Sequence, residues 1–499
     1  MTSANRWLVL AIVSSALLLI VIDMTVLYTA LPRLTHDLGA TASEKLWIVN
    51  AYPLVVAGLL PGLGTLGDRL GHKRLFTAGL VVFGFASLIA AYSPTPSILI
   101  AARVMLAVGA AMMMPATLSI IRLTFTDENE RAFAIGIWAA VASGGAALGP
   151  VVGGVLLEYF WWGSVFLINV PVVIVALVLA LVLLPNRPGK ADRPWDLIGS
   201  VQIMVGLVGV AYAIKEVSKR VPSWEAAAIA AVIGVVALVL FVRRQRASAA
   251  PLIDFTLFRN RRFSSGVATA LVASAALIGV ELVFSQRLQL VLGLSPLEAG
   301  LLILPIPLAA FLAGPLTGLA LPRLGNETVL WSSLALSGVG LGGFLLTYDL
   351  NQIVWLSLLA VMGFGVGAAM TAASTSIMLS APEDRAGMAA SVEEVSYELG
   401  GAMGIALMGS LMSALYTAAL VLPSGMDISA TARDSLDEAL IAAERLDPAA
   451  AQTLADLARG AFDYAFISVV AAAVVMLLGA ALGIRIAARR PVRETASVS

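Results

Sequence analysis

The chain has 499 residues, of which 60% are hydrophobic and 12% are charged, and its mean hydropathy is +0.94. This composition excludes a soluble globular protein and indicates a polytopic membrane protein. The 31 Lys and Arg balance the 31 Asp and Glu, and there is no cysteine, which excludes disulfides and thiolate metal sites.

Fourteen apolar runs follow one another along the chain, each about long enough to cross the roughly 30 Å hydrocarbon core of a bilayer. We therefore predict an all-α polytopic membrane protein with fourteen transmembrane helices. The first run lacks a small-residue cleavage site and is interpreted as a retained span, not a signal peptide. The predicted spans cover residues 7–31, 46–66, 76–93, 98–121, 132–156, 163–184, 197–214, 224–242, 263–285, 296–321, 328–348, 352–378, 387–415 and 462–484.

Basic residues are unevenly divided between the two sides of these spans. With both termini in the cytoplasm, 21 of the 31 Lys and Arg fall in cytoplasmic segments, 9 in outer segments and one, Arg103, within a span. Because Lys and Arg gather on the cytoplasmic side, we expect a cell (inner) membrane protein with both termini inside. The basic residues are divided among separate short loops, so we expect no nucleic-acid binding.

The first span contains a carboxylate, Asp23, within the run 22–32. A carboxylate inside a membrane is costly and commonly serves a functional role, such as binding and releasing a proton. The alternative is a structural ion pair with Arg103 of the fourth span, which could still tune the proton affinity of Asp23.

Glycines and charged residues are dense in segment 64–74, between the second and third spans. Asp68 could accept hydrogen bonds from a helix N-terminus or from an arginine, and the glycines permit a tight reversal. We predict a loop that acts as a two-state latch between helices, with a plain cytoplasmic charge anchor as the alternative. The residues assigned to this motif are Gly64, Asp68, Arg69, Gly71, Lys73 and Arg74.

The fifth span is unusually rich in glycine. Each interior glycine costs a helix about 1 kcal/mol relative to alanine, and proline about 3, so helix packing must offset the loss. We predict a packing seam against the other half of the molecule, bent at its proline; an ordinary small-residue packing face is the alternative. The seam comprises Gly136, Gly145, Gly149, Pro150, Gly153 and Gly154.

The thirteenth span carries Glu393, Glu394, Tyr397 and Glu398. Helical spacing places Glu394 and Glu398 on one face and Glu393 and Tyr397 on the adjoining face. Ionised, these carboxylates repel each other, and a bound organic cation would relieve the repulsion; cation binding and proton release would then be linked. The alternative is an interfacial position. Glu281, late in the ninth span, is a further candidate, either buried or interfacial.

The last outer segment, residues 416–461, is long and relatively polar, and its Ala, Leu, Asp and Glu content suggests short helices. It is interpreted either as a solvated loop or as a lid over the outer mouth.

Three sequence matches indicate that the chain contains a duplicated six-span unit. Residues 108–112 recur at 366–370, residues 64–71 resemble 318–325, and residues 144–146 recur at 400–402, all at nearly one offset. Eight spans fall within that offset, so two spans, at about 197–242, are interpreted as an insertion.

These segments resemble the signatures of the major facilitator superfamily, and of its fourteen-span drug:proton antiporters in particular. Segment 64–74 is similar to the superfamily's loop motif, with His72 in place of the usual Arg, and the glycine run of the fifth span fits the antiporter motif. The fourth-span motif keeps Arg103 and Gly109 but has Leu106 and Ala107 where Gln and Gly are usual.

The resemblance implies a major facilitator fold of two six-helix bundles plus two inserted helices. We expect an N-terminal bundle at 1–185, the inserted helices and linkers at 186–262, a C-terminal bundle at 263–485 and a cytoplasmic tail at 486–499.

The resemblance also implies a multidrug efflux pump that exports lipophilic cations in exchange for protons. Asp23, Arg103, Glu281 and the thirteenth-span glutamates would then serve proton coupling and cation binding. Aromatic side chains could face the cation, and the candidates are Tyr52, Trp138 and Tyr397, besides Trp47; ordinary packing is their alternative role.

No phosphate-binding loop, paired-histidine metal motif or nucleophile elbow occurs, so we expect a secondary transporter, not an enzyme, with no cofactor or metal. Its partners would be lipophilic cations, protons and the bilayer, and it would function as a monomer. The alternatives are an exporter of one endogenous metabolite, lipid or antibiotic, and a transporter-like sensor that does not pump.

Overall fold

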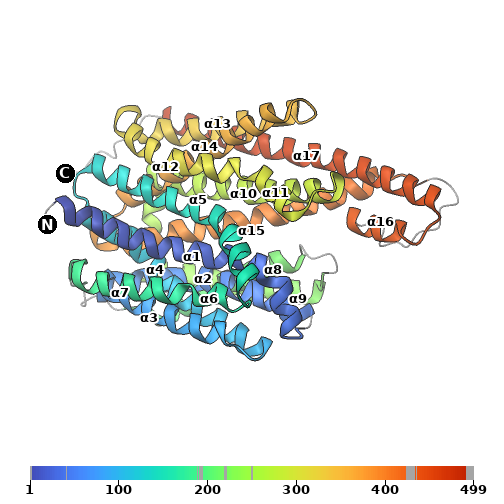
Figure 1. The fold of residues 1–499 in the computed structure, drawn as a ribbon. Coiled ribbons are helices and arrows are strands. Elements are labelled where there is room, and N and C mark those ends of the chain that lie inside the picture. Colours follow the sequence, from blue (N-terminus) through green and yellow to red (C-terminus); the bar gives the residue numbers. More distant parts are fainter. Residues whose placement is uncertain are drawn as a thin grey trace.

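The computed structural model describes residues 3–40, 42–187, 189, 195–217, 222–248, 251–422, 433 and 435–489. Within these ranges the fold is helical and has no strand (Figure 1). Its α-helices are α1 (Ser3–Asp37), α2 (Ala42–Leu70), α3 (His72–Ala91), α4 (Pro96–Thr124), α5 (Glu128–Tyr159), α6 (Ser164–Leu167), α7 (Asn169–Leu183), α8 (Leu197–Val217), α9 (Trp224–Ala247), α10 (Arg261–Gln286), α11 (Pro296–Ile303), α12 (Pro305–Leu324), α13 (Asn326–Thr347), α14 (Gln352–Ser380), α15 (Ala386–Ala419), α16 (Leu436–Ala443) and α17 (Pro448–Arg489). Two 3₁₀ helices, η1 (Phe255–Arg259) and η3 (Glu383–Arg385), and a π-helical turn, η2 (Arg287–Val291), complete the set.

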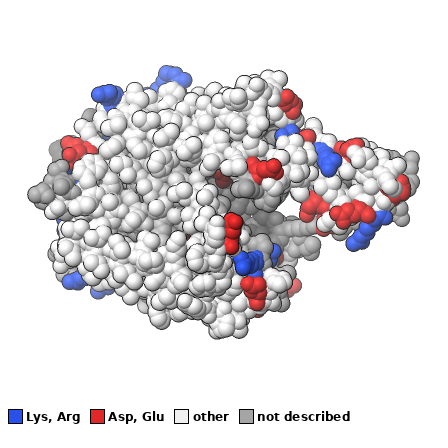
Figure 2. All heavy atoms as spheres, viewed as in Figure 1, with Lys and Arg blue, Asp and Glu red and all other residues white. Residues whose placement is uncertain are grey.

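Fourteen helical segments in the described chain are long and apolar enough to cross a membrane, and each overlaps one predicted span. Charged side chains gather toward the two ends of the molecule and leave a band of uncharged surface between them (Figure 2). The protein is therefore a multi-pass membrane protein, and the predicted fold class is confirmed.

The described chain begins with α1 and ends with α17 at one end of the helix bundle, which we call the proximal end; the opposite end is the distal end (Figure 1). At the distal end, α16 and the first turns of α17 project beyond the other helices. The predicted polar segment 416–461 is shorter in the structure, because α15 extends to Ala419 and α17 already begins at Pro448. Buried Leu454 and Ala458 continue the apolar face of α17 at four-residue spacing, which explains the early start.

The two halves of the chain are built in the same way, as the internal repeat predicts. Helix α1 packs on α5 as α10 packs on α15, and α2 packs on α4 as α12 packs on α14. Single glycines with positive φ, Gly71 (96°) and Gly325 (78°), join the second and third spans of each half. The predicted loop at 64–74 is therefore wrong in extent, since α2 is helical to Leu70 and α3 begins at His72.

The two inserted helices, α8 and α9, pack on each other, and α8 also contacts α2 and α15. Because α2 and α15 belong to different halves, the insertion lies alongside the seam between them. The boundaries predicted for the bundles and linkers stay predictions, and residues 490–499 of the predicted tail lie outside the described residues.

Candidate functional site

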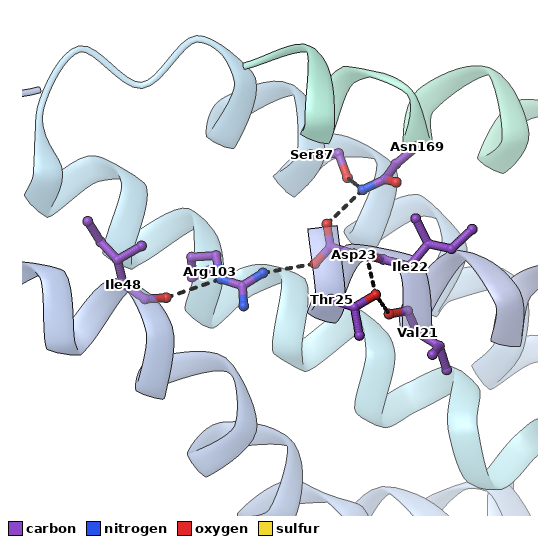
Figure 3. A network of polar contacts seen from close by, with 8 residues as sticks. All are labelled: Val21, Ile22, Asp23, Thr25, Ile48, Ser87, Arg103 and Asn169. Atoms are coloured by element: carbon purple, nitrogen blue, oxygen red, sulfur yellow. Dashed lines mark hydrogen bonds and ion pairs between the residues drawn. The ribbon is translucent and has the colours of Figure 1, made fainter. Parts of the chain in front are cut away.

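Asp23 lies in the middle of α1 and is fully buried (Figure 3). Its Oδ2 accepts a hydrogen bond from Nη1 of Arg103 on α4 at 2.8 Å, and its Oδ1 accepts one from Nδ2 of Asn169 on α7 at 2.9 Å. Asn169 also donates to Oγ of Ser87 on α3 at 3.2 Å. The ion pair that sequence analysis considered for Asp23 is therefore formed, and both oxygens of the carboxylate are used.

Arg103 is held by helices of the first half only. Its Nε donates to the carbonyl oxygen of Ile48 at 3.3 Å, and its guanidinium lies 4.5 Å from the ring centre of Tyr52, both on α2. Removing one partner of a buried ion pair leaves an uncompensated charge and typically costs 3–5 kcal/mol. The pair therefore ties the positions of α1, α2 and α4 to the charge state of Asp23.

The glutamates of α15 form a second acidic site, in the other half. Glu393 is fully buried and Glu394 is 5% exposed, so both lie inside the helix bundle, and their depth in the membrane stays a prediction. Oε1 of Glu393 accepts a hydrogen bond from the Ser374 hydroxyl of α14, whereas Oε2 of Glu393 and Oε1 of Glu394 have no partner among the described residues. Half-buried Tyr397 donates its hydroxyl to the carbonyl oxygen of Met370 at 3.3 Å.

Tyr52 of α2 interacts electrostatically with Asp23 of the first half and with Glu398 of the second. Its hydroxyl is fully buried and has no hydrogen-bond partner in the described part of the chain. Asp23, Arg103 and Glu398 are all close enough to this hydroxyl to act on it electrostatically. Charged groups of both halves thus converge on one buried phenol.

Asp68, near the end of α2, links the two halves at the proximal end. Its Oδ1 accepts from the backbone N–H of Gly387 at 2.8 Å and its Oδ2 from that of Met388 at 3.1 Å, both in the first turn of α15. A carboxylate at this place compensates the unpaired N–H groups and the positive end of the helix dipole. Nε2 of His72 lies 3.3 Å from Oδ1 of Asp68. The expected acceptance from a helix N-terminus is confirmed, while the role of the contact as a latch stays a prediction.

The basic residues of the predicted loop motif lie within the first half or at the surface. Lys73 donates its Nζ to the carbonyl oxygens of Leu181 and Leu184, at 2.8 and 2.7 Å, and so caps the C-terminal end of α7. Arg69 is half-buried and Arg74 is exposed.

The glycines of α5 have two different partners. Gly145, Gly149 and Gly153 approach α1 so closely that a Cβ on any of them would press against α1 side chains. The prediction that this stripe faces the other half is therefore wrong, because a stripe of small residues indicates a close neighbour but does not specify which helix it is. Gly136 does face the other half, since a Cβ there would collide with the carbonyl oxygen of Gly314 on α12.

Two further residues of the predicted seam, Gly154 and Pro150, remain to be placed. A Cβ on Gly154 would meet open space. Helix α5 is continuous through residue 150, and the bend expected at Pro150 stays a prediction.

The contact between α2 and α15 also depends on glycine, as the contact at Gly136 does. A Cβ on Gly64 of α2 would collide with the carbonyl oxygen of Gly387 on α15, and a Cβ on Gly387 would collide with that of Gly64. Glycine therefore brings the two halves into backbone contact on both sides of the molecule.

A segment after α9 also contacts the start of α15. Asp254 forms an ion pair with Arg385 of η3, and it accepts a hydrogen bond from the Thr256 hydroxyl at 2.6 Å. Partial burial works to raise the pKa of Asp254, but the hydrogen bonds from Thr256 and the Arg385 guanidinium together hold this pKa below its usual value. The carboxylate is therefore ionised at neutral pH.

The other predicted residues do not join these clusters. Glu281 is half-buried in α10 and has neither a hydrogen bond nor an ion pair to any described residue. Trp138 is 3% exposed and donates its Nε1 to Oγ1 of Thr117 at 3.0 Å, so it is packed between α5 and α4. The cavity roles of Tyr52, Trp138 and Tyr397 stay predictions.

Three polar residues of these sites were not predicted from the sequence. Asn169 and Ser374 donate hydrogen bonds to the buried carboxylates, and Ser87 accepts one from Asn169. Asn169 could have been noticed as an amide inside an apolar run, since polar groups inside membrane spans need partners. Serines carry no comparable signal, because they also occur at ordinary helix contacts.

The model of the Major Facilitator Superfamily matches residues 13–405. Among solved structures, the human organic anion transporter MFSD10 (TETRAN) has a similar fold, with a TM-score of 0.60 at 15% sequence identity, over 94% of this chain and 100% of that chain.

Curated relatives match over nearly the whole length. The methyl viologen resistance protein SmvA of Salmonella typhimurium is 42% identical over 96% of this chain and 97% of its own. The multidrug efflux pump LfrA of Mycolicibacterium smegmatis is 39% identical over 98% of this chain and 97% of its own. The helical fold, the buried charges and these matches agree: the chain belongs to the major facilitator superfamily and is a membrane transporter, not an enzyme.

Proposed function

We propose that this protein is a proton-coupled antiporter that exports lipophilic cations by alternating access. The observation that carries the proposal is the pair of buried carboxylates Glu393 and Glu394, which have oxygens without partners and no Lys or Arg within ion-pair distance in the described part of the chain. Buried carboxylates that lack a positive partner favour either a proton or a bound cation. Competition between the two is what exchange requires.

The relatives support the choice of substrate class. One is named for resistance to methyl viologen, a flat aromatic dication, and another for multidrug efflux. A flat cation fits a site that combines carboxylates with the aromatic rings of Tyr52 and Tyr397.

In the proposed cycle, the protein acts as a monomer in the cell (inner) membrane. Its proximal end faces the cytoplasm. Protons entering from the distal, outer side bind to Asp23 or to the α15 glutamates and release the cation. Loss of the protons toward the cytoplasm restores cation affinity. One elementary charge crossing 100 mV contributes about 2.3 kcal/mol, so a single proton per cycle could support an appreciable gradient.

The test is efflux of ethidium measured in everted membrane vesicles energised with a proton gradient. We expect wild-type transport to collapse when an uncoupler is added, and Asp23→Asn and Glu394→Gln to abolish it. Glu158→Gln, which neutralises an exposed carboxylate of α5, is the matched control and should transport normally. Transport that persists in Asp23→Asn, with its sensitivity to the uncoupler intact, would refute the coupling role of Asp23.

Direct measurement of dye binding distinguishes a loss of proton coupling from misfolding of a variant. Purified variants should keep a cooperative thermal transition, and ethidium affinity of the wild type should fall as the pH is lowered. The three glutamates Glu393, Glu394 and Glu398 are then neutralised one at a time. The variant whose dye affinity no longer depends on pH identifies the carboxylate at which the proton and the dye compete. An affinity that is independent of pH in the wild type would contradict exchange of a cation for protons.

A further inference from the structure

A cavity of about 820 Å³ lies at the distal end, apart from the buried carboxylates. It is lined by the distal turns of α10 and α15, by η2, α16 and α17, and by the adjoining ends of α8 and α9. This volume is in the range of pockets that hold drug-sized ligands, about 300–1,000 Å³.

The chemistry of the cavity suits an organic cation. Its lining includes Trp224, which is 67% exposed, and the buried aromatic residues Tyr416 and Phe462. Asp437 of α16 adds one carboxylate, and none of the described residues that line the cavity is Lys or Arg. Aromatic faces and a single negative charge are the combination that attracts a flat cation.

Helix α15 connects this cavity to the acidic site. Residues that are 7, 11 and 18 positions apart lie on nearly one face of an α-helix. Ile405, Gly409 and Tyr416, which line the cavity, stand at these spacings from Glu398. The lining therefore begins about 10 Å beyond Glu398, on the same face of the helix.

We propose that this distal cavity is a second binding site for the exported cation, occupied after the cation leaves the α15 glutamates. The inference rests on the proposed function, because it takes the same substrate class and the same direction of export. Asp437 supplies the counter-charge, and the exposed ring of Trp224 holds the apolar body of the cation.

The chain contains no cysteine, so a single introduced cysteine reports on one place only. Ser410→Cys places a thiol in the cavity wall, and Thr453→Cys places one on an exposed position of α17 that does not line the cavity. Both purified variants are labelled with a membrane-impermeant maleimide, with and without ethidium. We expect ethidium to slow labelling at position 410 at least fivefold and to leave labelling at position 453 unchanged.

Two further substitutions assign that protection to the cavity. Asp437→Asn added to Ser410→Cys should abolish the protection, whereas Glu398→Gln should leave it in place. Protection that is lost in Glu398→Gln and kept in Asp437→Asn would overturn the inference, since it would then report a change caused by binding at the central glutamates.

The two proposals fail in different ways. Proton-driven efflux without any protection at position 410 refutes the distal site alone. Protection at position 410 in a protein that shows no proton-dependent efflux supports the distal site and refutes the proposed antiport.

Discussion

Replacing Asp68 by asparagine should loosen the proximal contact between the two halves. The carboxylate accepts two backbone N–H groups from the start of α15, at 2.8 and 3.1 Å. Asparagine keeps one acceptor oxygen but loses the second acceptor and the charge that faces the helix dipole. A hydrogen bond to a charged group contributes about 1.5–3 kcal/mol and the dipole about 0.3–1, so we expect a loss of about 2 kcal/mol. That loss favours the proximally open state by about 30-fold.

The opening can be followed with a buried reporter. Ser391 of α15 is fully buried and lies directly opposite Gly64 of α2. In the cysteine-free chain, Ser391→Cys can react with a maleimide only when α2 and α15 separate. If the open state is the minor one, the labelling rate is proportional to its population, and Asp68→Asn should raise the rate about 30-fold.

A control with the same chemistry distinguishes this effect from general destabilisation. Asp127 caps the N-terminus of α5 within the first half, where its Oδ1 accepts from Asn129 N–H at 3.0 Å and from Glu130 N–H at 2.9 Å. Asp127→Asn likewise removes a charge that faces a helix N-terminus, and it should leave the labelling rate at position 391 unchanged. Equal acceleration by both substitutions, or none by Asp68→Asn, would refute the idea that Asp68 holds the halves together.

Two further predictions concern the seam and the linker. Gly136→Val should abolish efflux in a folded protein, because its side chain would collide with the backbone of α12, whereas Gly154→Ala, which meets open space, should transport normally in the same vesicle assay. Asp254→Asn should lower the melting temperature at neutral pH, because the folded chain holds the pKa of this carboxyl below its usual value. The stabilisation is full above the ordinary pKa of an aspartate, about 3.9, and disappears as the pH falls through the lower value in the folded chain. Melting curves of both proteins from pH 8 downward check this, and a difference that already shrinks between pH 7 and pH 5 would contradict it.

The spans and their repetition could be predicted from sequence because both depend on local patterns. Apolar length identifies a span without reference to its neighbours. The recurring string at 108–112 and 366–370 falls in α4 and α14, which occupy equivalent positions in the two halves. The ends of the helices were less predictable, since the start of α17 at Pro448 depends on packing against α16.

Partners across the fold could not be predicted to the same degree. The sequence identified Asp23 and Arg103 as charges inside spans, and their cost when unpaired made a mutual contact a reasonable expectation. Nothing local specified that Asn169 would occupy the second oxygen of Asp23. For the glycines of α5, spacing indicated a close neighbour, but only the three-dimensional arrangement separates the contact of Gly149 with α1 from that of Gly136 with α12.

Helix α15 takes part in three of the features described above. Its first turn is held by Asp68, its middle carries the buried glutamates, and its distal part lines the distal cavity. The helix is continuous from Ala386 to Ala419, so these regions move together unless the helix itself deforms. Glu398 lies 11 residues, or about 16 Å, from the contact at Gly387. A tilt about that contact therefore displaces the glutamates relative to Tyr52 and changes the electrostatic interaction between the halves. Under the proposed antiport, a proton or cation bound at the glutamates would therefore bias closure at Asp68 through α15.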